Sequence, residues 1–167
     1  MNFRSSLMTK GISNTIIVAR MALLSALSGV GAFIPIPSPV GSIALDSAPG
    51  YFAALAYGAL DGAGVCAIGH LLSAARAGYP LGTVHLLVAL LMAVVGVAVA
   101  TVSRRFGMIP GIVTGIAVNT AGAPLAVPVF GWGVLPILVP LLAVASSVNA
   151  VSVSYTHLRA HETSLHL

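Results

Sequence analysis

Two histidines stand inside otherwise apolar stretches, and their side chains are the best suited in the chain to bind a small molecule. His70 lies in GHLLSAA and His85 in TVHLLVALLM. In long apolar helices such groups are rare and normally face a bundle interior or a cavity. A neutral imidazole donates and accepts hydrogen bonds, so it suits a ring nitrogen or a hydroxyl of a ligand. The simpler alternative is that each histidine bonds only a neighbouring helix.

Four further residues complete the predicted binding set. Asn119 precedes a helix interruption at AGAP, and its default role is a hydrogen bond between helices. Tyr79 and Trp132 are interfacial aromatics by default, and stacking on a planar ligand is their second interpretation. Asp46, in ALDSAPG, most simply caps the helix that follows it. Asn149 is expected nearer the inner, cytoplasmic end of the last apolar segment.

No catalytic, metal or cofactor site is expected. Asp46 and Asp61 are the only credible carboxylates, which argues against a paired-carboxylate catalytic centre. The G-x-x-x-x-G-K-[ST] phosphate loop is absent, so this mode of ATP binding is excluded. A cluster of cysteine and histidine is absent outside the C-terminal segment, and a net charge of +4 makes no case for nucleic acid. Transport or binding is therefore favoured over catalysis.

The composition indicates that these residues are carried by helices in a lipid bilayer. Charged residues make up 6% and hydrophobic residues 58%, with a mean hydropathy of +1.06. Soluble domains carry about 25% charged residues. Continuous rather than alternating apolar runs favour helices over barrel strands. We predict an all-α polytopic membrane protein with six transmembrane helices, at residues 15–34, 48–60, 62–77, 81–102, 108–127 and 133–151.

The second and third of these segments are short for full spans. Asp61, Gly62 and Gly64 predict a tight polar turn between them. The alternative is one bent hairpin that reaches incompletely across the bilayer. The turn between the fourth and fifth segments is expected at residues 103–105, and prolines at alternate positions in IPIPSP predict an extended loop up to Asp46.

Charge asymmetry predicts the orientation. Cytoplasmic loops carry an excess of Lys and Arg. With both termini inside, the inner set is Arg4, Lys10, Arg104 and Arg105, against Arg76 outside. This N-in, C-in topology puts the Pro-rich loop 35–46, both histidines and the Trp132 loop towards the outer face. The loop is then expected to roof a ligand site in the outer half.

The last residues differ in character from the rest, so we predict one membrane domain at 1–152 and a separate segment at 153–167. The sequence VSYTHLRAHET resembles a translated sequencing-adapter read-through at the broken end of a gene. The alternative is a cytoplasmic tail.

The first apolar segment carries the candidate docking residues. Ala22 and Ala26 form an A-x-x-x-A pair on one helical face, which permits close approach of another helix backbone. Packing inside the protein is the alternative. Arg20 is expected to extend its charge to the membrane surface, with contact to a partner protein as the alternative.

Over about residues 16–151 the chain resembles a known family. ALLSALSGVGAFIPIP at 22–37, LDSAPG at 45–50 and GHLLS at 69–73 look like the substrate-binding S component of energy-coupling factor (ECF) transporters. The DSAPG and GHLLSA pieces look most like the branch associated with cobalamin precursors, notably α-ribazole.

The resemblance implies a multi-pass protein of a prokaryotic cytoplasmic membrane that captures a vitamin or its precursor from outside. It implies a transmembrane T component that docks on Ala22 and Ala26, two ATPase subunits, and a lid formed by residues 35–47. Two alternatives stay open. In the first, the ligand is another vitamin-like molecule, namely a thiamine precursor, riboflavin or folate. In the second, the chain is a small structural or assembly membrane protein without a ligand.

Overall fold

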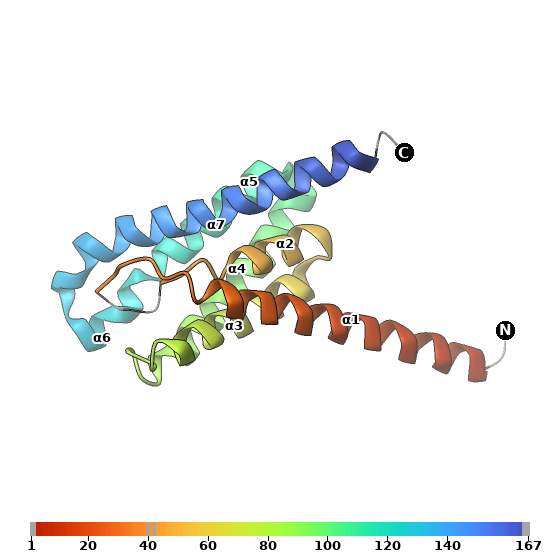
Figure 1. The fold of residues 1–167 in the computed structure, drawn as a ribbon, viewed down its shortest axis with the longest axis horizontal. Helices are drawn as coiled ribbons and strands as arrows, with labels where there is room; N and C mark the ends of the chain where they lie inside the picture. The colour runs from red at the N-terminus through yellow and green to blue at the C-terminus, as the bar shows by residue number, and fades with distance from the viewer. Residues whose placement is uncertain (1–2, 40, 42, 165–167) are drawn as a thin grey trace.

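The computed structural model describes residues 3–39, 41 and 43–164, and side chains for 14–39, 41 and 43–153. The predicted all-α class is confirmed (Figure 1). Six helices make up the body: α1 (Phe3–Gly31), α2 (Ala48–Ala56), α3 (Ala59–Arg76), α4 (Val84–Phe106), α5 (Met108–Ala121) and α7 (Leu135–Ser164). Short turns η1 (Ala123–Ala126), α6 (Val127–Phe130) and η2 (Trp132–Val134) join α5 to α7. Arg4 and Lys10 lie outside the described side chains.

Four stretches in the described part of the chain are long and apolar enough to cross a membrane. They are Asn14–Gly31, Val84–Phe106, Met108–Phe130 and Trp132–Val153. Helix α2 has 9 residues, so it is about 14 Å long and cannot cross an apolar layer about 30 Å thick. The predicted second span is therefore too short, and the structure favours the hairpin that crosses incompletely.

The turn between α2 and α3 lies three residues earlier than predicted. Gly58 forms it, with φ of 109°, a conformation that glycine adopts at little cost. Asp61, Gly62 and Gly64 instead lie inside α3. A Cβ added to Gly96 of α4 would collide with the backbone of Gly62, so α3 and α4 lie in direct backbone contact. Gly62, which suggested a tight turn in the sequence, thus serves close helix packing.

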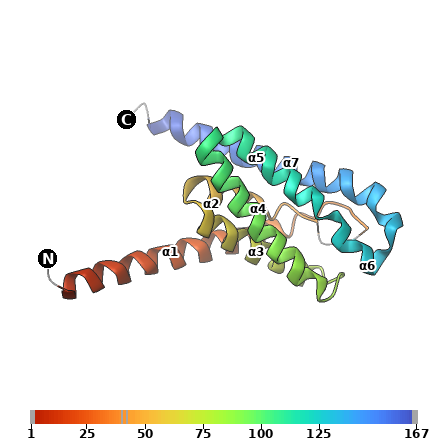
Figure 2. The same cartoon turned by 180° about the vertical axis from the view of Figure 1, so that it is seen from behind.

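The core lies where α2, α4, α5 and α7 meet. Tyr51, Val95 and Val99 are completely buried there, and Val153 of α7 joins them. Figure 2 shows α4 running between α3 and α5. Ser103, Arg104 and Arg105 belong to α4 rather than to the predicted turn, because the break comes at Gly107, where φ is 96°.

The loop between α1 and α2 is extended, as the alternating prolines predict. Its two sides pair in antiparallel fashion through a bridge between Pro35 and Ala44. The N–H of Ile36 donates to the carbonyl of Ile43 (2.9 Å), and the N–H of Leu45 to that of Ile34 (3.2 Å). The loop reaches towards the end of the molecule that carries α6, opposite the two termini (Figure 1).

Candidate functional site

A cavity of about 80 Å³ lies between the end of the first loop and helices α3, α4, α5 and α7. Its walls are mostly apolar, with Leu138 and Leu142 of α7 facing Met92 of α4. The polar lining residues come from four segments, the first loop and helices α3, α5 and α7: Asp46, Ser47, His70, Asn119, Ser146 and Asn149. An apolar chamber with a few converging polar groups is the usual form of a small-molecule site.

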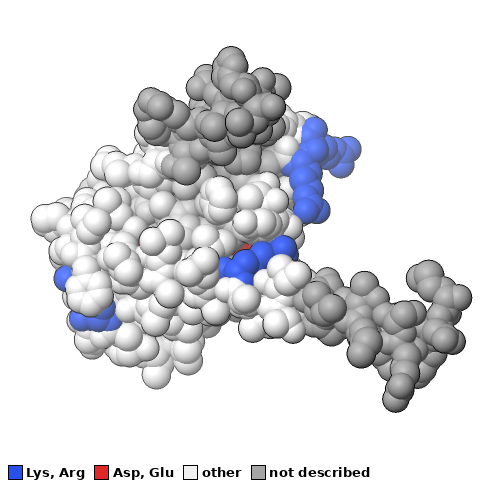
Figure 3. Space-filling view, turned by 45° about the vertical axis from the view of Figure 1, so that its right-hand side comes forward, with Lys and Arg blue, Asp and Glu red and all other residues white. Residues whose placement is uncertain are grey.

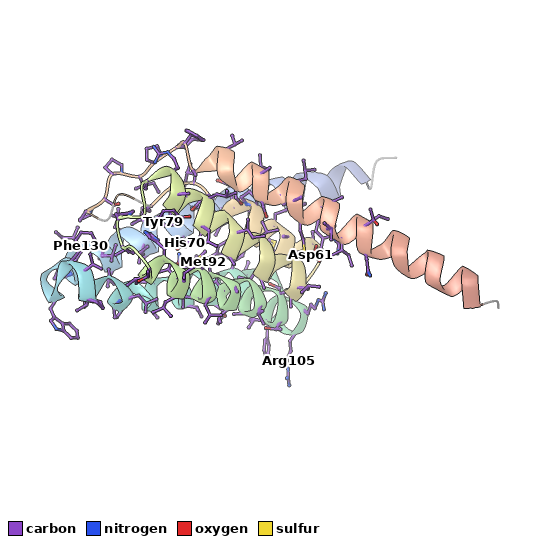
Figure 4. The ribbon with its side chains drawn as sticks, turned by 90° about the horizontal axis from the view of Figure 1, so that it is seen from below. Asp61, His70, Tyr79, Met92, Arg105 and Phe130 are labelled. Carbon is purple, nitrogen blue, oxygen red and sulfur yellow. The ribbon has the colours of Figure 1, made fainter. Side chains whose placement is uncertain are left out.

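The two predicted histidines meet at one wall of this chamber. His70 Nε2 lies 3.1 Å from His85 Nδ1, and the N–H of Leu81 donates to His85 Nε2 at 3.2 Å. His70 lines the cavity, whereas His85 is fully buried behind it. The Tyr79 ring packs edge-on against His85, with centroids 5.7 Å apart. Figure 4 shows His70, Tyr79 and Met92 in the half of the molecule away from the termini, and Tyr79 is partly exposed there.

Asn149 holds the start of α2 from the opposite wall. Its Oδ1 accepts from the N–H groups of Ser47 (3.1 Å) and Ala48 (2.9 Å), and its Nδ2 donates to the carbonyls of Ala44 and Ala145. The prediction that Asp46 caps this helix is therefore wrong. Asn149 lies near the C-terminal end of the apolar span Trp132–Val153, as expected, although α7 itself continues to Ser164. It is buried, so its amide replaces water for groups at the start of α2.

Asp46 is buried beside the cavity with its carboxylate held by hydroxyl groups. Ser47 Oγ donates to Asp46 Oδ1 at 3.0 Å, and Ser73 of α3 is a second hydrogen-bond donor. Burial raises the pKa of Asp46 to about 6, and the hydrogen bonds from Ser73 and Ser47 act in the opposite direction. The carboxyl group is therefore easier to protonate than that of an exposed aspartate.

Three of the six predicted binding residues line the cavity and three do not. Asp46, His70 and Asn119 are in the lining, and Asn119 Nδ2 donates to Ser146 Oγ at 2.6 Å. His85 and Tyr79 lie behind the wall as described. Trp132, with 75% of its surface exposed, points away from the chamber, which suits the interfacial role that is its default.

Sequence reasoning missed Ser146 and did not assign Asn149 to the site. Both lie on the face of α7 that also carries Leu138, Leu142 and Ala145. The spacing of 138, 142, 145 and 149 is the three-to-four residue period of one helical face. That period is present in the sequence. In a membrane helix, however, the lipid-facing and interior faces are both apolar, so the period does not stand out.

A family model described as ECF transporter, substrate-specific component matches residues 17–156. The chain belongs to this family. No curated protein and no solved structure matches this chain. It is a multi-pass protein of a prokaryotic membrane and a non-catalytic transport subunit that captures a substrate for ECF uptake. Membership implies a T component and ATPase partners.

The S component presents the A-x-x-x-A face of α1 outward. Ala22 and Ala26 are both exposed, whereas Ser25 and Ser28 on the other side of the helix are buried. Packing of the two alanines inside the protein, the alternative from sequence, is therefore wrong. Most of the described surface on the face seen in Figure 3 is uncharged, as expected of a membrane protein.

Arg20 of the S component, expected from the sequence to extend to the membrane surface, pairs with a carboxylate on α3. Its Nε and Nη2 donate to the two carboxylate oxygens of Asp61 at 2.6 and 2.7 Å, and its guanidinium lies 4.5 Å from the centre of the Tyr57 ring. Asp61 is buried. A buried carboxylate without a partner costs free energy of folding. The ion pair with Arg20 avoids that cost and joins α1 to α3.

Proposed function

We propose that this S component captures a planar vitamin precursor of the α-ribazole type in the cavity between α3, α4, α5 and α7. The observation that carries the proposal is the convergence of Asp46, His70, Asn119 and Asn149 on one apolar chamber. A heteroaromatic ring with an attached ribose needs this combination. The apolar walls suit the ring, and the carboxylate and amides suit the hydroxyls of the sugar.

Ligand entry requires movement of the segment at 43–47, on this proposal. The cavity of about 80 Å³ is well below the roughly 300–1,000 Å³ of typical ligand sites. Ile43, Ala44, Asp46 and Ser47 form the wall nearest the extended loop. Displacement of that wall enlarges the chamber without separating the packed helices. The lid role implied by the family resemblance agrees with this position.

An N-in, C-in orientation fits the distribution of charge along the bundle. Both termini lie at one end (Figures 1 and 2), and Arg105 lies towards that end in Figure 4. The guanidinium of Arg104 packs against Gly58 at the same end. Arg76, at the other end of α3, lies over the ring of Phe33. The cavity then belongs to the outer half, from which an uptake system receives its substrate.

The exposed face around Ala22 and Ala26 is the proposed docking site for the T component. Small side chains there permit close approach of a partner helix. The Arg20–Asp61 pair supports the same proposal, because it limits rotation of α1 and keeps the two alanines outward.

We expect His70→Ala to weaken α-ribazole binding about five- to 150-fold, the effect of leaving a buried hydrogen-bonding group unpaired. Calorimetry on purified, folded protein measures this change. Tyr57→Phe is the control. Tyr57 lies far from the cavity, and the substitution keeps the ring that packs against Arg20, so we expect wild-type affinity.

Unchanged affinity in His70→Ala would place the ligand elsewhere. Binding of a thiamine precursor, riboflavin or folate in place of α-ribazole would reject the proposed ligand class and keep the substrate-capture role.

Deletion of residues 157–167 is expected to leave ligand affinity unchanged, since the adapter-like segment predicted at 153–167 is proposed to be non-native in the part beyond the family match. The deletion begins after Val153 because that side chain is 4% exposed in the core, and after 156 because the family match extends so far. Replacement by a natural helix end should raise the melting temperature. A folded deletion variant with reduced affinity would show that the segment is part of the functional protein.

A further inference from the structure

We propose that His85 is a positioning residue that sets the tautomer of His70, so that the cavity selects ligands with an in-plane hydrogen-bond acceptor. The inference rests on the proposed function of the cavity and names the chemistry of its ligand. It follows from a chain of three groups: the N–H of Leu81, the ring of His85 and the ring of His70.

The chain has a direction because a backbone N–H only donates. Leu81 donates to His85 Nε2, so that nitrogen uses its lone pair and bears no proton. A neutral His85 then carries its proton on Nδ1 and donates to His70 Nε2. His70 Nε2 is in turn an acceptor, and the proton of neutral His70 is on Nδ1. The hydrogen bond at one nitrogen thus determines the state of the other.

The surroundings keep this chain intact. His85 is 1% exposed and Leu81 7% exposed, so water does not compete for their hydrogen bonds. Protonation of His85 would leave the Leu81 N–H facing a second donor. The hydrogen bonds found among the described residues do not use His70 Nδ1. That N–H is therefore the group that His70, as a lining residue, offers to a ligand.

A donor fixed in this way distinguishes ligands by their lone pairs. An sp² ring nitrogen or a carbonyl oxygen accepts from His70, whereas a C–H or N–H at the same position leaves the donor unpaired. The expected discrimination is about five- to 150-fold in affinity. A histidine free to change tautomer could also accept from an N–H, so it would not discriminate between a ligand acceptor and an N–H donor.

The first test is nitrogen-15 NMR of histidine-labelled full-length protein in lipid nanodiscs, without ligand. His70→Gln and His85→Gln spectra assign the two rings. We expect both rings to carry their proton on Nδ1. In His85→Phe, His70 loses its donor and should shift towards the Nε2–H form that free histidine prefers, whereas His85→Gln, which keeps an acceptor and a donor, should preserve the Nδ1–H form. A wild-type His70 protonated on Nε2 would overturn the inference, whether or not His85→Phe folds.

The second test is a matched pair of probes, 1-methylbenzimidazole and 1-methylindole, titrated against the same protein. They share a shape, but only the first has an in-plane lone pair on its five-membered ring. We expect the first to bind at least about fivefold more tightly, with the preference lost in His70→Phe. Equal binding, or binding of neither probe, with His70 in the Nδ1–H form would reject the selectivity. The proposed function is decided separately, by α-ribazole binding to wild type and His70→Ala.

Discussion

Ala22→Trp and Ala26→Trp are each expected to abolish co-purification of the S component with its T component, while ligand binding stays largely intact. Close approach of two helix backbones requires small side chains at the contact, and an indole separates them. Both alanines are exposed on α1, so the substitution does not disturb the core. Affinity capture of the T component from membranes that contain both proteins measures the result.

Ala117→Trp is the matched control for this experiment. Ala117 is also an exposed alanine, but it lies on α5, which packs against α4 and α7 rather than α1. We expect this variant to retain the complex. Equal recovery of the T component with wild type, Ala22→Trp and Ala26→Trp would reject α1 as the docking face. Loss of the complex in the control Ala117→Trp as well as in Ala22→Trp and Ala26→Trp would indicate a general effect of added bulk in the membrane.

Asn149→Leu is expected to lower the free energy of unfolding by about 2–4 kcal/mol and to weaken ligand binding. The substitution keeps the number and branching of the side-chain heavy atoms but leaves the N–H groups of Ser47 and Ala48 and the carbonyl of Ala44 without their partner. These groups belong to the segment that closes the cavity. The substitution therefore removes both the cap of α2 and the contacts that hold this segment in place. Thermal and chemical denaturation in detergent, with calorimetry for the ligand, measure both effects.

Asn119→Leu provides the comparison, because it also removes an amide from the cavity wall. In the described part of the chain, the Asn119 side chain makes one hydrogen bond, to Ser146, and it holds no helix N-terminus. We expect its effect on stability to be less than half that of Asn149→Leu. If the two variants melt at the same temperature, the cap does not contribute as proposed.

The sequence by itself determined the fold class and the membrane location, whereas the outward orientation of Ala22 and Ala26 came from the structure. These depend on composition and helical period, which are local properties: scarce charges and continuous apolar runs leave few alternatives to helices in lipid. The same reasoning identified His70 and His85 as unusual, since an imidazole in an apolar helix needs a partner. The Pro-rich loop was likewise predictable, because alternating prolines exclude a helix whatever surrounds them.

Only the tertiary structure decided which partner each polar group has. Asp61 and Gly62 resemble a turn in the sequence, but α1 supplies Arg20 to the first and α4 brings Gly96 against the second. Asp46 precedes α2, but Asn149, about a hundred residues away, caps that helix. In an apolar chain a buried hydrogen-bonding group must find a partner among very few others. Which of them it finds depends on how the helices pack, and no local pattern in the sequence records that choice.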